Sequence, residues 1–139
     1  MSDFELMKAA EAARDKAYSP YSCFRVGAAL LTKNGKVYVG CNIENASFTP
    51  TVCAERVAFF EAIKDGERDF SAIAIVGGKA GDNPTFCAPC GVCRQVMAEF
   101  CQKDFRVLLG TKENFKAYSF EDLFPLSFSP EDLKCNSKI

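Results

Sequence analysis

The first part of the chain shows two patterns of apolar and polar positions, one typical of a helix and one typical of strands. Residues 4–18 carry apolar side chains at near-helical spacing with charges between them, and Pro20 ends this pattern. Two β-rich runs, 26–31 and 36–42, then flank Asn34-Gly35, a dipeptide that tolerates positive φ. These patterns predict an amphipathic helix followed by a β-hairpin.

Helix-like and strand-like runs continue to the end of the chain. A 3.6-residue apolar period predicts a helix, and a continuous apolar run predicts a strand covered on both faces. In order, we expect a helix at 53–64, a strand at 71–76, a helix at 90–100, strands at 106–109 and 116–120, and a short turn at 121–124. This order predicts an α/β fold: one domain, residues 1–139, forming a three-layer α/β/α sandwich with a mixed sheet of about five strands.

Composition narrows the class of partner. The 139 residues include 17 basic and 18 acidic side chains, so the formal charge of -1 provides no positive field for a polynucleotide, and we expect no nucleic-acid partner. No apolar run approaches the length of about 18 residues that a membrane span requires, so we expect no membrane association. The first residues lack the pattern of a secretion signal, so we expect a cytoplasmic protein whose eight cysteines are thiols, metal ligands or nucleophiles and not disulfides.

Candidate chemistry is concentrated in two short motifs, Cys53-Ala54-Glu55 and Pro89-Cys90-Gly91-Val92-Cys93, in a chain without histidine. Both motifs begin predicted helices, whose free N–H groups and positive dipole ends favour thiolates. Three thiolates leave the fourth position of a zinc ion open for water, which is typical of a catalytic site. The sequence therefore predicts a zinc enzyme with the ligands Cys53, Cys90 and Cys93.

Two neighbours of Cys53 complete this prediction. Glu55 can move protons to and from the water, provided that Cys53 lies at the first, not fully helical, position. Three thiolates leave the centre with a net charge of -1, which disfavours ionisation of the water. Arg56 can offset this charge by donating hydrogen bonds to the ligand sulfurs.

Other roles for the thiols stay open. Cys90 and Cys93 alone would suit a redox dithiol, although this leaves Cys53 and Glu55 unexplained. Cys87, Cys90 and Cys93 match the start of an iron–sulfur motif, but the fourth position is Met97. A structural zinc module would need a fourth ligand, for which only Cys87 is near. The remaining cysteines are interpreted as buried or incidental: Cys23, Cys41, Cys101 and Cys135.

With Cys-Ala-Glu-Arg at 53–56 and Pro-Cys-Gly-Val-Cys-Arg-Gln at 89–95, the chain resembles the small, homotetrameric cytidine deaminases. The resemblance extends over Tyr-Ser-Pro-Tyr-Ser at 18–22, Phe-x-Val-Gly-Ala-Ala at 24–29 and Gly-x-Asn-Ile-Glu-Asn-Ala at 40–46. It implies hydrolytic deamination of cytidine and 2'-deoxycytidine in pyrimidine salvage, with one zinc ion per subunit and Glu55 as the proton shuttle.

The same resemblance implies a nucleoside-binding set. Asn42 and Glu44 are the implied partners of a sugar hydroxyl, Phe24 part of the ribose wall, and Ala54 a further substrate contact. In the segment Leu-Phe-Pro-Leu-Ser-Phe at 123–128, the resemblance implies that Phe128 stacks on the nucleoside base bound by a neighbouring subunit. Phe124 is a competing candidate for this role.

One departure from the family pattern concerns Phe48, which stands where many relatives have tyrosine and which therefore cannot donate a hydroxyl hydrogen bond.

Two alternative enzyme functions also remain open. A deaminase of a blasticidin-type nucleoside would share the metal motifs, although Asn42 and Glu44 favour an ordinary ribose. A deaminase of cytosines in RNA or DNA is disfavoured because the chain lacks a basic run.

Overall fold

The computed structural model describes residues 1–134, and Cys135 lies outside the described residues. Its elements are α1 (Asp3–Arg14), β1 (Gly27–Thr32), β2 (Val37–Cys41), α2 (Ala54–Lys64), β3 (Phe70–Val76), α3 (Gly91–Phe100), β4 (Arg106–Thr111), β5 (Asn114–Ser119), α4 (Phe120–Leu123) and the 3-10 helix η1 (Pro130–Leu133). Within residues 1–134, no helix is long and apolar enough to span a membrane.

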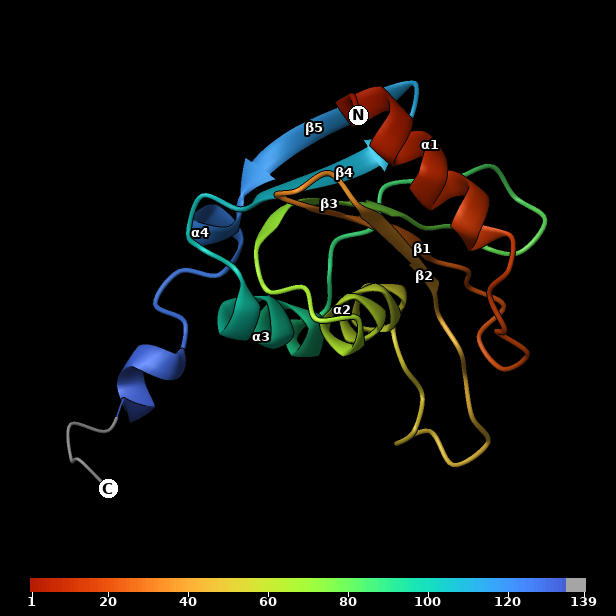
Figure 1. The fold of residues 1–139 in the computed structure, drawn as a ribbon. Helices are drawn as coiled ribbons and strands as arrows, with labels where there is room; N and C mark the ends of the chain where they lie inside the picture. Colours follow the sequence, from red (N-terminus) through yellow and green to blue (C-terminus); the bar gives the residue numbers. More distant parts are fainter. Residues whose placement is uncertain (135–139) are drawn as a thin grey trace.

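Five strands form one mixed sheet in the order β2-β1-β3-β4-β5. β3 and β4 pair in parallel across α3, and the other neighbouring pairs are antiparallel. Helix α1 covers one face of the sheet, while α2 and α3 cover the other, so the molecule has the three layers that the sequence predicts (Figure 1). The α/β fold is confirmed.

An apolar cluster lies on each face of the sheet. Leu6, Met7 and Ala10 of α1 pack on one face, and Phe59 of α2 and Met97 of α3 belong to the larger cluster on the other. All of these side chains are at most 1% exposed. Burial on both faces explains why β3 is an apolar run, since a central strand has no polar side.

Helix α1 ends earlier than we predicted. Ser2 caps its N-terminus by accepting a hydrogen bond from the Glu5 N–H, but the helix stops at Arg14 instead of extending to residue 18. Beyond it, Tyr18 forms a parallel bridge with Ile43. The apolar period continues past Arg14, but pairing with the segment after β2 prevails over helix propensity.

Two glycines let the helices approach the sheet. A Cβ atom on Gly27 would lie 2.0 Å from the Ala10 carbonyl oxygen, and one on Gly40 would lie 2.3 Å from the Ala54 carbonyl oxygen. Side chains at these positions would therefore push α1 away from β1 and α2 away from β2. The second contact fixes the N-terminus of α2, where Cys53 lies.

Candidate active site

Two helix N-termini present the cysteines of the two motifs. Cys53 is the N-cap of α2 and Cys90 is the N-cap of α3, both in extended backbone conformation, and neither thiol caps its own helix. Cys93 lies in the first turn of α3 and is 1% exposed. The expectation that Cys53 occupies the non-helical first position is therefore confirmed.

The three sulfurs converge. Cys90 Sγ lies 3.6 Å from both Cys53 Sγ and Cys93 Sγ, and all three atoms lie within 4.8 Å of one another. A tetrahedral zinc ion with Zn–S bonds of about 2.3 Å separates its sulfurs by about 3.8 Å. The two S–S distances of 3.6 Å are therefore close to those of a zinc site with three thiolate ligands.

No fourth protein ligand joins this cluster within residues 1–134. Cys87 is outside it, and its thiol points toward the Ala88 carbonyl oxygen at 3.7 Å. Met97, at the fourth position of the iron–sulfur motif, is fully buried in the apolar core. This geometry disfavours both a closed structural zinc site and an iron–sulfur cluster, because each needs a fourth ligand.

The surroundings favour negative charge on the sulfurs. A hydrogen bond from the Cys93 thiol to the Cys53 sulfur lowers the pKa of Cys53 to about 5, and Arg56 contributes to this lowering. Because Cys93 donates the proton of this hydrogen bond, the pKa of Cys93 is raised. Arg56 Nη2 donates to Cys53 Sγ at 3.4 Å. The structure thus places Arg56 against a ligand sulfur, as we predicted.

Glu55 lies beside the cluster in the first turn of α2 and is 3% exposed. Burial raises the pKa of its carboxyl group to about 7, and the nearby Cys53 adds to the effect. A carboxyl group with this pKa exchanges protons readily near neutral pH, which a general acid–base catalyst requires. The neighbouring Ala54 is fully buried.

β2 ends at Cys41, one residue before the end of the run that we predicted over 36–42. Asn42 and Glu44 therefore lie just after the strand. Asn42 Oδ1 accepts from the Val26 N–H and Asn42 Nδ2 donates to the Phe24 carbonyl oxygen, both at 2.8 Å. Asn42 thereby ties the segment after β2 to the segment that carries Phe24.

Glu44 is fixed by three donors that sequence reasoning did not identify. Glu44 Oε1 accepts from the backbone N–H groups of Tyr21 at 2.9 Å and Ser22 at 3.1 Å, and Oε2 accepts from the Ser22 hydroxyl. The hydrogen bond from the Ser22 hydroxyl is the main reason why the pKa of Glu44 is lowered. Pro20 signals a turn in this segment, but no sequence pattern indicates that the turn binds Glu44.

Phe24 is half-buried against the segment that follows β3. An added Cβ atom on Gly77 would lie 3.1 Å from Phe24 Cζ and 2.5 Å from Cys87 Cβ, so these residues are in close contact. Burial raises the pKa of the Cys87 thiol to about 11. Cys87 is therefore a packed thiol beside Phe24, a role that the sequence left open.

The two remaining aromatic candidates are exposed. Phe128 is 56% exposed, and its carbonyl oxygen accepts from Gln95 Nε2 of α3 at 2.8 Å. Phe48 is 70% exposed, has a φ of 58°, and packs edge-on against Tyr21. The structure does not bring either ring into the apolar core.

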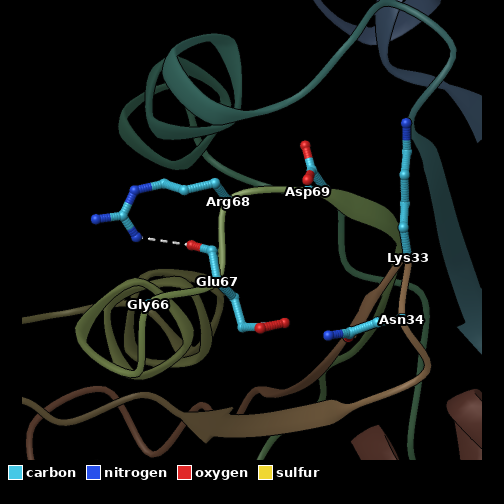
Figure 2. A pocket seen from close by; sticks show the side chains of 6 residues that line it. All are labelled: Lys33, Asn34, Gly66, Glu67, Arg68 and Asp69. Atoms are coloured by element: carbon cyan, nitrogen blue, oxygen red, sulfur yellow. Dashed lines mark hydrogen bonds between the residues drawn. The ribbon is translucent and has the colours of Figure 1, made fainter.

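A surface hollow of about 370 Å³ lies at the other end of α2. Figure 2 shows its six lining residues, Lys33, Asn34, Gly66, Glu67, Arg68 and Asp69. Helix α2 extends for 11 residues between the cysteines and this hollow, about 16 Å at the usual rise of 1.5 Å per residue. None of the predicted site residues lines it.

Three thiols open to one side, a buried carboxyl group and an α/β/α sandwich together define a zinc-dependent hydrolytic enzyme. The family model described as "Cytidine and deoxycytidylate deaminase zinc-binding region" matches residues 1–109. The chain belongs to this family and is a zinc-dependent deaminase.

Individual relatives agree. The chain is 47% identical over 130 residues to a cytidine deaminase of Sporosarcina psychrophila, covering 93% of both chains. It is similar to the crystal structure of a cytidine deaminase from Burkholderia pseudomallei, with a TM-score of 0.84, 48% identity, and coverage of 92% of this chain and 100% of that one. A more distant relative is the blasticidin-S deaminase of Bacillus cereus, 32% identical over 108 residues and covering 75% of this chain and 76% of that one.

Proposed function

We propose that this protein deaminates free cytidine and 2'-deoxycytidine to uridine and 2'-deoxyuridine, with release of ammonia, in pyrimidine salvage. The observation that carries this proposal is the convergence of three sulfurs, 3.6 Å apart in two pairs, beside a carboxyl group that is 3% exposed. The relatives named as cytidine deaminases support the choice of substrate.

Cys53, Cys90 and Cys93 would hold the zinc ion, which supplies a polarised water at its fourth position when bound. Glu55 would accept one proton from that water and deliver it to N3 of the base, and would then carry the second proton of the same water to the amino group, which leaves as ammonia. Its raised pKa of about 7 suits both directions of transfer near neutral pH. Arg56 would remove negative charge from Cys53 through its hydrogen bond at 3.4 Å.

The sugar would be bound by the residues that follow β2. Asn42 and Glu44 both face residues 21–26, and each keeps hydrogen-bonding capacity: a second N–H on the amide and further lone pairs on the carboxylate. One hydroxyl group could therefore donate to Glu44 and accept from Asn42. The Phe24 ring would form the wall beside the ribose, and Ala54, at the start of α2, would contribute a backbone contact.

We propose a homotetramer in which Phe128 of one subunit stacks on the base bound by another. The chain after α4 extends away from the sheet (Figure 1), and Leu126 and Phe128 on it are exposed. Exposed apolar side chains on an extended segment are typical of a surface that a partner covers. Phe124 is a weaker candidate because it packs against Phe120 within its own subunit.

Active-site mixing tests this arrangement. Glu55→Ala and Phe128→Ala subunits should each show little activity, but co-refolded mixtures should recover part of it, since a site with Glu55 from one subunit and Phe128 from another is complete. Light scattering would give the subunit number. Mixtures without recovered activity, or an active monomer, would contradict the shared site.

We further propose that residues 1–139 form one domain, since all five strands join one sheet. A cytoplasmic location is supported by the free thiols of Cys53, Cys90 and Cys93, which a reducing compartment preserves. Fractionation of the native host with an antibody against the chain would test the location.

The decisive test of the function is the absorbance change from cytidine to uridine, together with ammonia release, for zinc-loaded protein. Activity should disappear after chelation and return with zinc. Glu55→Ala should retain zinc and lose most turnover. Zinc binding without ammonia release from any cytosine nucleoside would refute the proposal.

A blasticidin-type substrate is the second candidate because one relative carries that name at 32% identity. Asn42 and Glu44 favour an ordinary ribose, so we expect cytidine to be the better substrate by kcat/KM. A higher kcat/KM for the antibiotic would reverse the assignment.

A further inference from the structure

The segment between β3 and α3, residues 77–89, is hydrogen-bonded to the backbone on both sides of Phe24. The Arg25 N–H donates to the Gly78 carbonyl oxygen at 2.9 Å, and the Ala80 N–H donates to the Cys23 carbonyl oxygen at 2.7 Å. We call residues 77–89 the β3–α3 loop. It leads directly into Cys90, so a shift of this loop would displace the Phe24 ring and alter the approach to the zinc ligands.

A buried arginine holds this loop from the side of α1. Arg14 is 5% exposed, and its Nη2 atom donates to the carbonyl oxygens of Lys79 at 2.9 Å and Asp82 at 3.1 Å. Burying a guanidinium group is costly unless its donors are satisfied. Here Nη2 donates to two loop carbonyls, whereas the buried Nε has no partner among residues 1–134. The position of Arg14 in the last turn of α1 is favourable because the helix dipole stabilises a cation there.

A glycine contact holds the loop at its first residue. Gly77 pairs with Thr85 through two backbone hydrogen bonds of 2.8 and 3.0 Å, which closes the loop on itself. A Cβ atom at Gly77 would lie 2.5 Å from Cys87 Cβ and 3.1 Å from Phe24 Cζ. Any side chain at this position would therefore force Cys87 and the Phe24 ring apart.

We propose that Arg14 and Gly77 are positioning residues of the nucleoside pocket, which act through the β3–α3 loop to set the place of the Phe24 ring. The inference rests on the proposed role of Phe24 as the ribose wall. It assigns the two residues to substrate binding and not to proton transfer, because the hydrogen bonds of Arg14 go to the β3–α3 loop and the nearest side chains to Gly77 are Cys87 and Phe24.

The first test compares Arg14→Met and Arg14→Lys with Arg106→Met. Arg106 also ties α1 to the sheet, through Asp3, but it lies at the start of β4 and does not contact the β3–α3 loop. We expect Arg14→Met to raise KM for cytidine about tenfold, the effect of losing one well-placed contact, with kcat and zinc content unchanged. Arg14→Lys should recover part of the KM, and Arg106→Met should leave it unchanged.

The second test adds a methyl group at Gly77 and then removes the side chain of Cys87 on the other side of the contact. It does not depend on the folding of the Arg14 variants. Gly77→Ala should raise KM for cytidine by a similar factor. Gly77→Ala combined with Cys87→Gly should bring KM back toward the wild-type value, because the second substitution removes Cys87 Cβ and Sγ, which the new methyl group meets at 2.5 and 3.1 Å. Only the 3.1 Å approach to Phe24 Cζ is then left, and the methyl group can move away from the ring into the space that Cys87 vacates.

The outcomes separate this inference from the function on which it rests. If Phe24→Ala leaves KM unchanged, the proposed ribose wall is wrong. If Phe24→Ala raises KM but the Arg14 and Gly77 variants do not, or if they lower kcat with KM unchanged, the positioning role is wrong. Absence of rescue in the Gly77 and Cys87 double variant would also overturn it.

Discussion

Glu55→Gln should stabilise the zinc-free protein, and it should abolish the activity of the zinc-loaded protein. Glu55 is 3% exposed, and burial raises the pKa of its carboxyl group to about 7. The folded state therefore favours the protonated carboxyl group, and above neutral pH it must bury a carboxylate. Glutamine has nearly the same shape but no charge at any pH, so the substitution removes this cost.

The size of the effect follows from the pKa difference. The folded value of about 7 exceeds the ordinary value of 4.5, and at 1.36 kcal/mol per pH unit this difference corresponds to about 3 kcal/mol. Because the pKa is raised, the folded protein binds more protons than the unfolded chain between these two values, and its stability falls as pH rises through them. Below about pH 4.5 the two proteins should be equally stable, and above about pH 7 the variant should exceed wild type by the full amount.

Urea unfolding in the presence of a chelator measures this difference. Wild type, Glu55→Gln and the control Glu61→Gln would be compared at a series of values from about pH 5 to about pH 8. Glu61 is an exposed carboxylate on the same helix, so its variant should show no such trend. Comparing variants at each pH cancels the titrations of the groups that do not interact with residue 55.

A stability difference between Glu55→Gln and wild type that does not change with pH would refute this reasoning. It would mean that the carboxyl group keeps an ordinary pKa because water or a rearranged side chain solvates it in the zinc-free protein. A Glu55→Gln variant that is destabilised at high pH would refute it as well, since the folded state would then favour the carboxylate.

Three further predictions follow from single contacts. Arg56→Gln removes the donor to Cys53 Sγ and should weaken zinc binding about 10- to 100-fold in chelator competition, because ligand orientation depends on such partners. Asp65→Asn should bring the pKa of Tyr38 down from about 12 toward its ordinary value, as measured by NMR titration of the ring, because the Asp65 carboxylate accepts a hydrogen bond from the protonated Tyr38 hydroxyl and so stabilises it. Gly40→Ala should destabilise the fold by about 3 kcal/mol in urea unfolding, because the new methyl group meets the backbone of α2 at 2.3 Å.

The sequence predicts the layers of the fold and the metal cluster because both depend on local patterns. Apolar periods identify α2, β3, α3 and β4 to within about one or two residues. The cysteine motifs begin helices, and helix N-termini are positions where a thiolate is favoured. Convergence of Cys53 on Cys90 then follows once two helices share one face of the sheet.

Features that depend on contacts between distant segments were not predictable in this way. The end of α1 at Arg14 depends on the bridge between Tyr18 and Ile43. The early start of β5, at residue 114 instead of 116, depends on its tight pairing with the end of β4. The donors around Glu44 belong to a turn, whose hydrogen bonds leave no periodic signal in the sequence.

The position of Glu55 brings two opposing effects together. It lies in the first turn of α2, where the helix dipole favours a carboxylate by about 0.3–1 kcal/mol. Burial opposes ionisation by about 3 kcal/mol, so burial prevails and the pKa rises. A carboxyl group on the same turn that was open to water would keep its proton only in acid and could not return it near neutral pH. The cost in stability and the capacity for proton transfer therefore have the same origin, the packing that encloses Glu55 beside the three cysteines.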